Sequence, residues 1–275
     1  MAKFAIVYSL RDPAGLGSAK ILVDILKARS INCPGTIECF TSEHAIIAGF
    51  DLDVIDFEFL DERPDPSAEA VIVLSRHSSE SKRKTLSVHH VGNPTMSSWG
   101  GEPYTLSFSY PALSKSLLLN YRRIALEENL YDYDITLEAT HHGPTRPVKP
   151  IVFIEIGSTE AEWRDERAQR VLALTVAETI SKPLRECKPA IGLGGTHYPE
   201  RFTRMHLESD ICFGHIIARY QLNQGVPGNV IKLAITKSYP RKAEVIVAEK
   251  KSLKREQREL IENIVAELSI TVDYH

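Results

Sequence analysis

The residues best suited to chemistry gather in one segment, 138–157, with the sequence EATHHGPTRPVKPIVFIEIG. His141 and His142 stand side by side before a glycine–proline turn, and the short, β-branched apolar run 151–156 that follows predicts a buried strand. Glu155 interrupts that run. Because burying a carboxylate without a partner is costly, we expect Glu155 to meet a cation, a metal or several donors. The strand ends before a predicted helix, a usual place for a site in α/β proteins.

Several more of the chain's 10 histidines lie where a predicted strand ends or a glycine turn begins. His77 follows an apolar strand at 70–74, His89 lies near the end of the next strand, and His197 follows a glycine pair. Imidazole can bind a metal or act as a base near neutral pH, and Glu155 could complete either arrangement. For each histidine alone, a hydrogen-bonded loop residue is the simpler interpretation. Taken together, they predict one site at an edge of the sheet.

The absence of several motifs narrows the chemistry. The sequence contains no HExxH zinc motif and no GxSxG nucleophile turn. Cys212 lies in an apolar segment, which is typical of a core cysteine rather than a nucleophile. Activated water is therefore the expected nucleophile, whereas histidines scattered over several loops have no spacing that identifies a metal site.

The elements that must position these residues alternate along the chain. Short apolar runs predict buried strands, and apolar residues at helical spacing predict amphipathic helices. Strands are expected at 4–9, 70–74, 85–94, 151–156, 190–196, 230–235 and 244–248, and helices at 18–26, 113–129, 160–180 and 254–268. This alternation predicts an α/β fold of three layers, in which a mixed or largely parallel sheet is flanked by helices.

The size and charge of the chain limit its class. With 275 residues, 43% of them hydrophobic, it can bury a large core, and we expect one α/β domain over 1–275. Any lobe boundary is expected near the acidic segment 61–69. The net charge of −3 excludes a protein that is basic overall. The acid-rich run 51–69 is expected to be a solvated edge and linker that faces away from nucleic acid.

The cysteines and the apolar runs bear on the compartment. None of the four cysteines forms a CxxC pair, so neither a zinc ribbon nor a disulfide framework is supported. The first residues are strand-like rather than a signal peptide, and no apolar run approaches the roughly 18 residues that a membrane helix needs. We therefore expect a cytoplasmic monomer with reduced thiols and no membrane contact.

Basic residues form four modest groups, and any one of them is most often a solvated face. Two groups follow directly on the proposed site loops, which would suit a polyanionic substrate at the mouth of the site. These two are Lys82, Arg83 and Lys84, and Arg146 with Lys149. The other two are Lys237 with Arg241 and Lys242, and Lys250 and Lys251 with Lys254 and Arg255.

A series of motifs spread over nearly the whole chain resembles the D-aminoacyl-tRNA deacylase family of archaea and plants. The motifs are SRHSS (75–79), VHHVGNP (88–94), EATHHGPT (138–145), IEIGSTE (154–160), GLGGTHYPERFT (192–203) and FGHIIARY (213–220). The resemblance implies hydrolysis of the ester between a D-amino acid and tRNA, and a zinc cofactor. It also implies a phosphorylase/hydrolase-like α/β fold similar to that of peptidyl-tRNA hydrolase.

The resemblance also implies roles for individual residues. The expected catalytic residues are His77, His141, His142, Glu155 and His197, and the expected metal ligands are His89, His141, His142, Glu155 and His215. Water would attack the ester carbonyl with a histidine or Glu155 as base, while zinc or backbone N–H groups near Gly194 and Gly195 stabilise the oxyanion. The substrate-binding residues expected are Gly143, Gly194 and Gly195 for close backbone approach, and Lys82, Arg83, Lys84, Arg146 and Lys149 for the charged tRNA.

Two other functions are compatible with the same residues. Scattered histidine and glutamate ligands could serve a metal-dependent peptidase or amidohydrolase. The glycine loops and basic groups could instead belong to a tRNA- or nucleotide-binding protein without catalytic activity. Release of tyrosine from D-tyrosyl-tRNA, measured beside a peptide substrate and beside binding of uncharged tRNA, separates the three.

Overall fold

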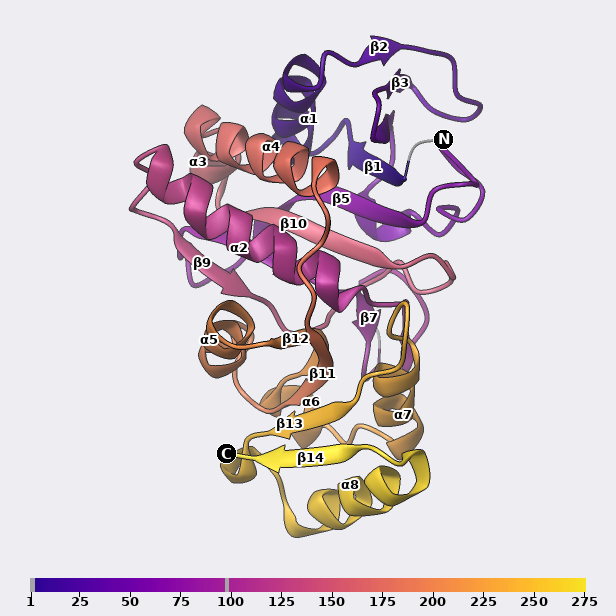
Figure 1. Ribbon diagram of the computed structural model, residues 1–275, viewed down its shortest axis with the longest axis vertical. Coiled ribbons are helices and arrows are strands. Elements are labelled where there is room, and N and C mark those ends of the chain that lie inside the picture. The colour runs from indigo at the N-terminus through magenta and orange to yellow at the C-terminus, as the bar shows by residue number, and fades with distance from the viewer. Residues whose placement is uncertain (1–2, 97–98) are drawn as a thin grey trace.

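The chain builds two large sheets with helix α2 (Pro111–Glu127) between them, as the computed structural model shows for residues 3–96 and 99–275 (Figure 1). A third, two-stranded sheet pairs β7 (Gly92–Asn93) with β8 (Thr105–Leu106). The larger sheet has the strand order β2-β3-β4-β1-β5-β10-β6-β9 and is mixed, with a parallel centre. Its strands are β1 (Phe4–Ser9), β2 (Arg29–Ser30), β3 (Glu38–Thr41), β4 (Ala45–Phe50), β5 (Ala70–Ser78), β6 (Thr85–His89), β9 (Asp134–Leu137) and β10 (Ile151–Ser158). The predicted α/β fold is confirmed.

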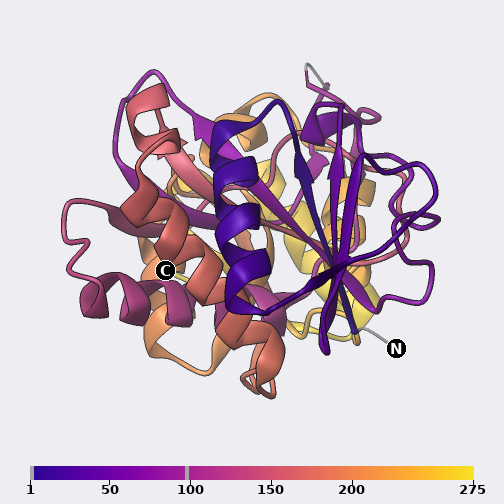
Figure 2. The same ribbon diagram turned by 90° about the horizontal axis from the view of Figure 1, so that it is seen from above.

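Helices cover one face of the larger sheet, and an irregular segment covers the other (Figure 2). The helical face carries α1 (Pro13–Ile25), α2, α3 (Glu160–Trp163) and α4 (Glu166–Ser181). On the opposite face, Phe57 and Leu60 from the segment after β4 pack with Phe50. The same cluster contains the side chains of β1 and β5 that point to this face, namely Ala5, Val7, Val71 and Val73. Alternating side chains of the central strands therefore enter two different cores.

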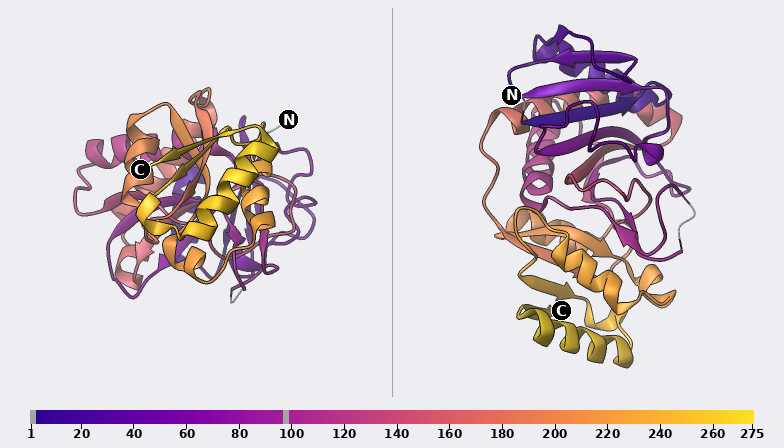
Figure 3. Two further views of the ribbon diagram at one scale, coloured as in Figure 1. Left: turned by 90° about the horizontal axis from the view of Figure 1, so that it is seen from below. Right: turned by 90° about the vertical axis from the view of Figure 1, so that its right-hand side faces the viewer.

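The smaller sheet is formed by the C-terminal part of the chain (Figure 3). Its four strands are all parallel, in the order β12-β11-β13-β14. They are β11 (Lys188–Leu193), β12 (Ile211–Ile217), β13 (Val245–Ala248) and β14 (Thr271–Tyr274), with α5 (Glu200–Glu208), α6 (Arg219–Asn223), α7 (Gly228–Thr236), η2 (Lys250–Ser252) and α8 (Arg255–Leu268) around them. One buried cluster joins side chains of this sheet, such as Phe213 and Val247, to those of the larger sheet.

Several predicted elements differ from those observed. The expected strand at 230–235 is part of helix α7, in which Val230, Ile231, Ala234 and Ile235 are buried at helical spacing. A short, β-branched apolar run fits either element, and here packing on the smaller sheet selects the helix. The expected helix at 160–180 is interrupted where Asp165 caps α4 by accepting from the Arg167 N–H. The predictions contain no counterpart of strands β2, β3, β4, β9, β12 and β14.

The expectation of reduced thiols is wrong for this structure. Cys33 bonds to Cys39, and Cys187 to Cys212, with Cα atoms 5.9 and 5.7 Å apart. The second bridge joins the segment before β11 to the neighbouring strand β12, so the pairing follows from sheet order and not from cysteine spacing. Across residues 3–96 and 99–275, no helix combines the length and apolar character that crossing a membrane requires.

The acidic run also differs from its prediction. Glu58 accepts hydrogen bonds from the N–H groups of Thr145 and Arg146, and Asp61 accepts from those of Val148 and Lys149. The run therefore binds the loop that follows the histidine pair, because its carboxylates satisfy backbone donors that no strand partner reaches.

Lys115 connects α2 to the smaller sheet through hydrogen bonds. Its side chain is buried, and its ammonium donates to the carbonyl oxygens of Ser209 (2.8 Å) and Ile211 (2.9 Å), and also to that of His206. These carbonyls lie between the end of α5 and the start of β12. One cation thus satisfies backbone acceptors at the junction between the two sheets.

Replacing this cation should destabilise the protein. Lys115→Met leaves the carbonyls without a donor, and we expect the free energy of unfolding to fall by about 2–3 kcal/mol, as for a buried hydrogen-bonded charge. Chemical denaturation would measure the change. Lys20→Met, at an exposed position of α1, is the matched control and should have little effect. Equal losses in the two variants would contradict this account of Lys115.

Candidate active site

A pocket of about 610 Å³ opens where the parallel strands β1, β5 and β10 end. The ends of neighbouring parallel strands meet at one edge, which is where α/β proteins build their sites. Loops and strand ends from both large sheets line this pocket. The lining residues are Ser9, Arg11, Asp12, Asp53, Val54, Ile55, Ser75, Arg76, His77, Ser78, Ser79, Glu80, Trp99, His141, His142, Glu155 and His197.

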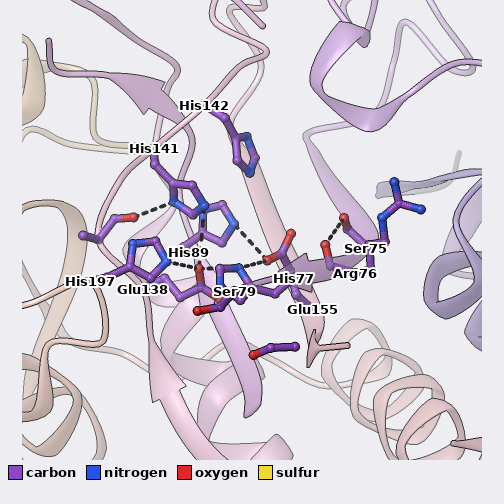
Figure 4. Close-up of polar contacts among 12 residues, drawn as sticks. Ser75, Arg76, His77, Ser79, His89, Glu138, His141, His142, Glu155 and His197 are labelled. Atoms are coloured by element: carbon purple, nitrogen blue, oxygen red, sulfur yellow. Dashed lines mark hydrogen bonds and ion pairs between the residues drawn. The ribbon is translucent and has the colours of Figure 1, made fainter. Parts of the chain in front are cut away.

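Glu138 is the centre of a cluster of histidines beside this pocket (Figure 4). It follows β9 and is fully buried. Its Oε2 lies 2.9 Å from His77 Nδ1, 2.9 Å from His197 Nε2 and 3.7 Å from His141 Nε2. The three imidazoles come from the end of β5, from the loop after β11 and from the segment after β9. A single carboxylate therefore contacts imidazoles from three separate parts of the chain.

Glu155 is a second buried carboxylate in the same cluster. It lies on β10, with its Oε2 3.3 Å from His77 Nδ1 and 3.5 Å from His89 Nε2. Glu155 therefore lies within ion-pair distance of two imidazoles, as expected for a buried carboxylate that needs a cation nearby. The ring of His89 stacks on His141 at 4.5 Å between centroids and lies 5.1 Å from His142. The histidine pair and Glu155 therefore converge at one place.

Backbone carbonyls fix the protons of the histidine pair. His141 Nδ1–H donates to the carbonyl oxygen of Ala139 at 2.8 Å, and His142 Nδ1–H to that of Gly143 at 2.6 Å. In a neutral imidazole held this way, Nε2 carries the lone pair. His141 Nε2 then faces the Glu138 carboxylate, so two acceptors approach each other. A proton or a metal ion between them would make this arrangement favourable.

The charges of the cluster follow from burial and neighbours. Burial lowers the pKa of His77, but Glu138 and Glu155 outweigh that effect and raise it to about 11. Burial raises the pKa of Glu138, yet the imidazoles of His77 and His197 hold it well below its usual range. Burial and the neighbouring His89 lower the pKa of His142 to about 4. At neutral pH the site therefore combines two carboxylates, an imidazolium and neutral imidazoles.

The cluster contains three overlapping groups of residues that could hold a metal ion. They are His77, Glu138, His141 and His197; His89, His141 and His142; and His89, Glu138 and Glu155. Four buried atoms of these residues lack a hydrogen-bond partner, namely His77 Nε2, His89 Nε2, Glu138 Oε1 and Glu155 Oε2. Imidazole nitrogens and carboxylate oxygens are ligands that zinc takes in catalytic sites, so the donor set fits.

His215 does not join the cluster, although it was expected to bind metal. It is fully buried, and its Nδ1 pairs with Thr140 Oγ1 at 3.1 Å while its Nε2 donates to the Ser107 carbonyl at 2.9 Å. Both ring nitrogens are therefore engaged within the protein. The residue tethers β12 to neighbouring loops.

The glycine pair also lies outside the pocket lining. Gly194 donates its N–H to the Ile217 carbonyl at 2.9 Å, and Gly195 donates to Glu249 Oε2 at 2.9 Å. The backbone donors expected to stabilise an oxyanion are thus used inside the protein. Gly143 donates to the Trp99 carbonyl at 3.1 Å, and a Cβ there would meet the backbone nitrogen of Gly101 at 2.6 Å. Close packing against the 100–101 backbone therefore requires a glycine at this position.

None of the basic residues expected to bind tRNA lines the pocket, and most have partners in the protein. Arg83 pairs with Asp134 at 2.8 Å, Lys84 with Asp132 at 3.0 Å and Arg146 with Glu102 at 3.0 Å. Lys149 donates to backbone carbonyls of the acidic segment, including that of Asp65 at 2.8 Å. Lys82 is exposed. Conversely, Asp53 of the acidic segment does line the pocket, against the expectation that this segment faces away.

Two buried acids of the site were missed by the sequence analysis. Glu138 stands at the start of the EATHHGPT motif, three residues before His141, which was the available signal. Asp12 caps α1 by accepting from Ala14 N–H at 2.9 Å, and its other oxygen accepts from Arg76 N–H at 2.7 Å. In the sequence, an aspartate directly before a proline is typical of a helix start, and this could have identified Asp12 as a capping residue. Asp12 thus ties β1 to the segment of β5 that carries His77.

Comparisons with known proteins agree on one family. A family model described as D-aminoacyl-tRNA deacylase matches residues 64–273. The chain is 50% identical to the D-aminoacyl-tRNA deacylase of Aeropyrum pernix, covering 99% of both chains, and 42% identical to that of Staphylothermus marinus, covering 100% of both. A crystal structure described as a conserved protein of unknown function superimposes with a TM-score of 0.92 at 29% identity, over 99% of this chain and 95% of the other.

The charge on His77 can be tested in protein freed of metal by a chelator. Burial lowers the pKa of His77, but the two carboxylates raise it to about 11, so its imidazole should stay protonated at pH 8. Nitrogen chemical shifts of the histidines, measured by NMR over a pH series, would report this. Glu138→Gln should lower the pKa of His77, whereas Glu127→Gln, exposed at the end of α2, should not. A neutral His77 at pH 8 in the native protein would contradict the assignment.

Proposed function

The chain belongs to the D-aminoacyl-tRNA deacylase family, and we propose that it hydrolyses the ester bond between a D-amino acid and tRNA at the Glu138–Glu155 cluster. The observation that carries this proposal is the buried Glu138, which contacts imidazoles from three separate segments beside a pocket of about 610 Å³. That volume suits an aminoacyl group and part of the nucleotide that carries it.

The reaction needs a water molecule, a proton acceptor and stabilisation of the oxyanion. Water adds to the ester carbonyl, the ribose oxygen leaves and takes a proton, and the products are the free D-amino acid and tRNA. We assign proton acceptance to His141, which is neutral. Burial and the neighbouring imidazoles hold the pKa of His141 well below its usual range. Protonated His77 is the cation available to donate to the developing oxyanion or the leaving oxygen. His197, partly exposed at the pocket, would contact the substrate.

Zinc is the proposed cofactor. The residues that would hold it are His89, Glu138 and Glu155, which form one compact group of possible ligands and leave His141 free to accept a proton. The buried atoms His89 Nε2 and Glu155 Oε2, which lack hydrogen-bond partners, support a cation there. When bound, zinc would polarise the ester carbonyl and lower the pKa of a coordinated water. Glu138 takes the place that the sequence analysis had given to His215.

We also propose a location, an oligomeric state and a domain organisation for this enzyme. We place the enzyme in the cytoplasm, because charged tRNA is its substrate. We expect a monomer in solution. We also treat 1–275 as one domain, since one buried cluster contains residues of both sheets.

Neutralising the central carboxylate should remove most of the activity. Glu138→Gln should lower kcat/KM for D-tyrosyl-tRNA by about 10²–10⁴-fold, the usual contribution of a positioned acid–base group. Released tyrosine is the readout, with Glu127→Gln as the matched control. Parallel assays with a peptide substrate test for a peptidase. Wild-type activity in Glu138→Gln, or hydrolysis of the peptide alone, would refute the proposal.

Metal removal gives an independent test. Dialysis against a chelator should remove bound zinc and abolish hydrolysis, and added zinc should restore both. Elemental analysis should also find less zinc per chain in Glu138→Gln and in Glu155→Gln. His44→Gln, far from the cluster, should retain the wild-type content. Full turnover by protein shown to be metal-free would exclude zinc as the cofactor.

A further inference from the structure

We propose that one edge of the smaller sheet binds the phosphate backbone of the tRNA acceptor arm. This edge, which we name the C-terminal basic edge, consists of Arg204, Arg219, Lys250, Lys251 and Lys254. The inference rests on the proposed function, because it takes charged tRNA as the substrate. It places the phosphate contacts outside the pocket, because Arg11 and Arg76, which line the pocket, already pair with Asp51 and Asp53.

The topology of the smaller sheet brings these cations together. Arg219 follows β12, Lys250 and Lys251 follow β13, and Arg204 lies on α5, the helix after β11. Because these strands are parallel neighbours, their following segments lie at one edge. In Figure 1, α5 and the C-terminal end of the chain accordingly lie on the same side of the lower part of the molecule.

Hydrogen bonds connect the segments that carry the cations. The Arg219 N–H donates to the Gly195 carbonyl at 3.0 Å, and the Gly195 N–H donates to Glu249 Oε2 at 2.9 Å. Glu249 directly precedes Lys250, whose own N–H donates to the His275 carbonyl at 2.8 Å. The edge is therefore held by backbone contacts that leave the cationic side chains free.

The cations of this edge are exposed and lack carboxylate partners. Across residues 3–96 and 99–275, no ion pair involves any of its five members. The nearby Glu249 is occupied by the Gly195 N–H and by Arg201, at 3.6 Å. Glu200 is the other acid of the adjoining depression. A free cation binds phosphate and releases counterions without first giving up a carboxylate. Arg83, Lys84 and Arg146, by contrast, would each have to exchange a partner.

The basic edge is continuous with the catalytic cluster. A depression of about 400 Å³ is lined by Gly195, Thr196, Arg201 and Arg204, with Glu200 and Glu249. The next residue along the loop after Thr196 is His197, which lines the pocket and contacts Glu138 at 2.9 Å. A backbone held at the edge can thus lead its 3′ end past His197 to the carboxylates. Since the whole chain carries a net charge of −3, a local basic surface must provide the docking.

A triple substitution tests this surface. Arg204→Gln, Lys250→Gln and Lys251→Gln together should raise KM for D-tyrosyl-tRNA about tenfold and leave kcat nearly unchanged. The plot of log(kcat/KM) against log salt concentration should become less steep by about two to three, because each phosphate contact contributes roughly 0.7–0.9 to the slope. Hydrolysis of D-tyrosyl-adenosine, which has no phosphates, should match the wild type. Binding of uncharged tRNA, measured over the same salt series, should weaken in parallel.

The matched control is the triple variant Lys82→Gln, Arg83→Gln and Lys84→Gln, which removes the same number of charges near the pocket. We expect its KM and salt dependence to match the wild type. The proposal is overturned if the first variant binds tRNA with the wild-type salt dependence, or if only the control variant loses affinity. Failure of the wild type to hydrolyse either substrate would refute the proposed function instead, and the binding series would still decide whether the edge holds tRNA.

Discussion

Two carboxylates buried in one site set the requirements that the surrounding structure meets. Glu138 and Glu155 are both at most 2% exposed, and neither could remain ionised there without nearby positive charge or strong donors. His77 lies between them, within 3.3 Å of an oxygen of each. Burial alone would raise the pKa of both carboxyl groups, but the imidazoles hold it below its usual range. The cluster is therefore one electrostatic unit, in which removing any member changes the protonation of the others.

This unit depends on contact between the two sheets. Glu155 and His77 lie on the parallel strands β10 and β5, and His89 is brought beside them by β6, which runs antiparallel to β10. His197 comes from the smaller sheet, so it reaches Glu138 only while the sheets keep their relative position. Helix α2 lies between them, and Lys115 binds carbonyls at the junction. Stability at this junction and geometry at the catalytic cluster are thus linked.

The charged surface has two kinds of cation. Near the pocket, most of the cations are paired or bound to carbonyls, as Arg83, Lys84 and Lys149 are. The acidic segment also binds the loop after the histidine pair through Glu58 and Asp61. On the C-terminal basic edge, the cations have no such partners in the described parts of the chain. Paired charges contribute to local structure, whereas unpaired, exposed charges remain available to a polyanion. A protein that is acidic overall can in this way bind tRNA on one face.

The sequence by itself determined the α/β class, the long amphipathic helices and the membership of most of the cluster, because hydrophobic periodicity and the histidine and glutamate motifs are local properties. It could not identify 230–235 as a helix, since a short β-branched run fits either element until its packing partner is known. Nor could it show that Glu138 is central while His215 is structural. Both are polar residues in motifs of similar appearance. Only the fold decides that Glu138 meets three imidazoles, whereas both ring nitrogens of His215 are occupied. The disulfides and the pairing of surface cations were decided in the same way, because each depends on which residue a distant segment places opposite.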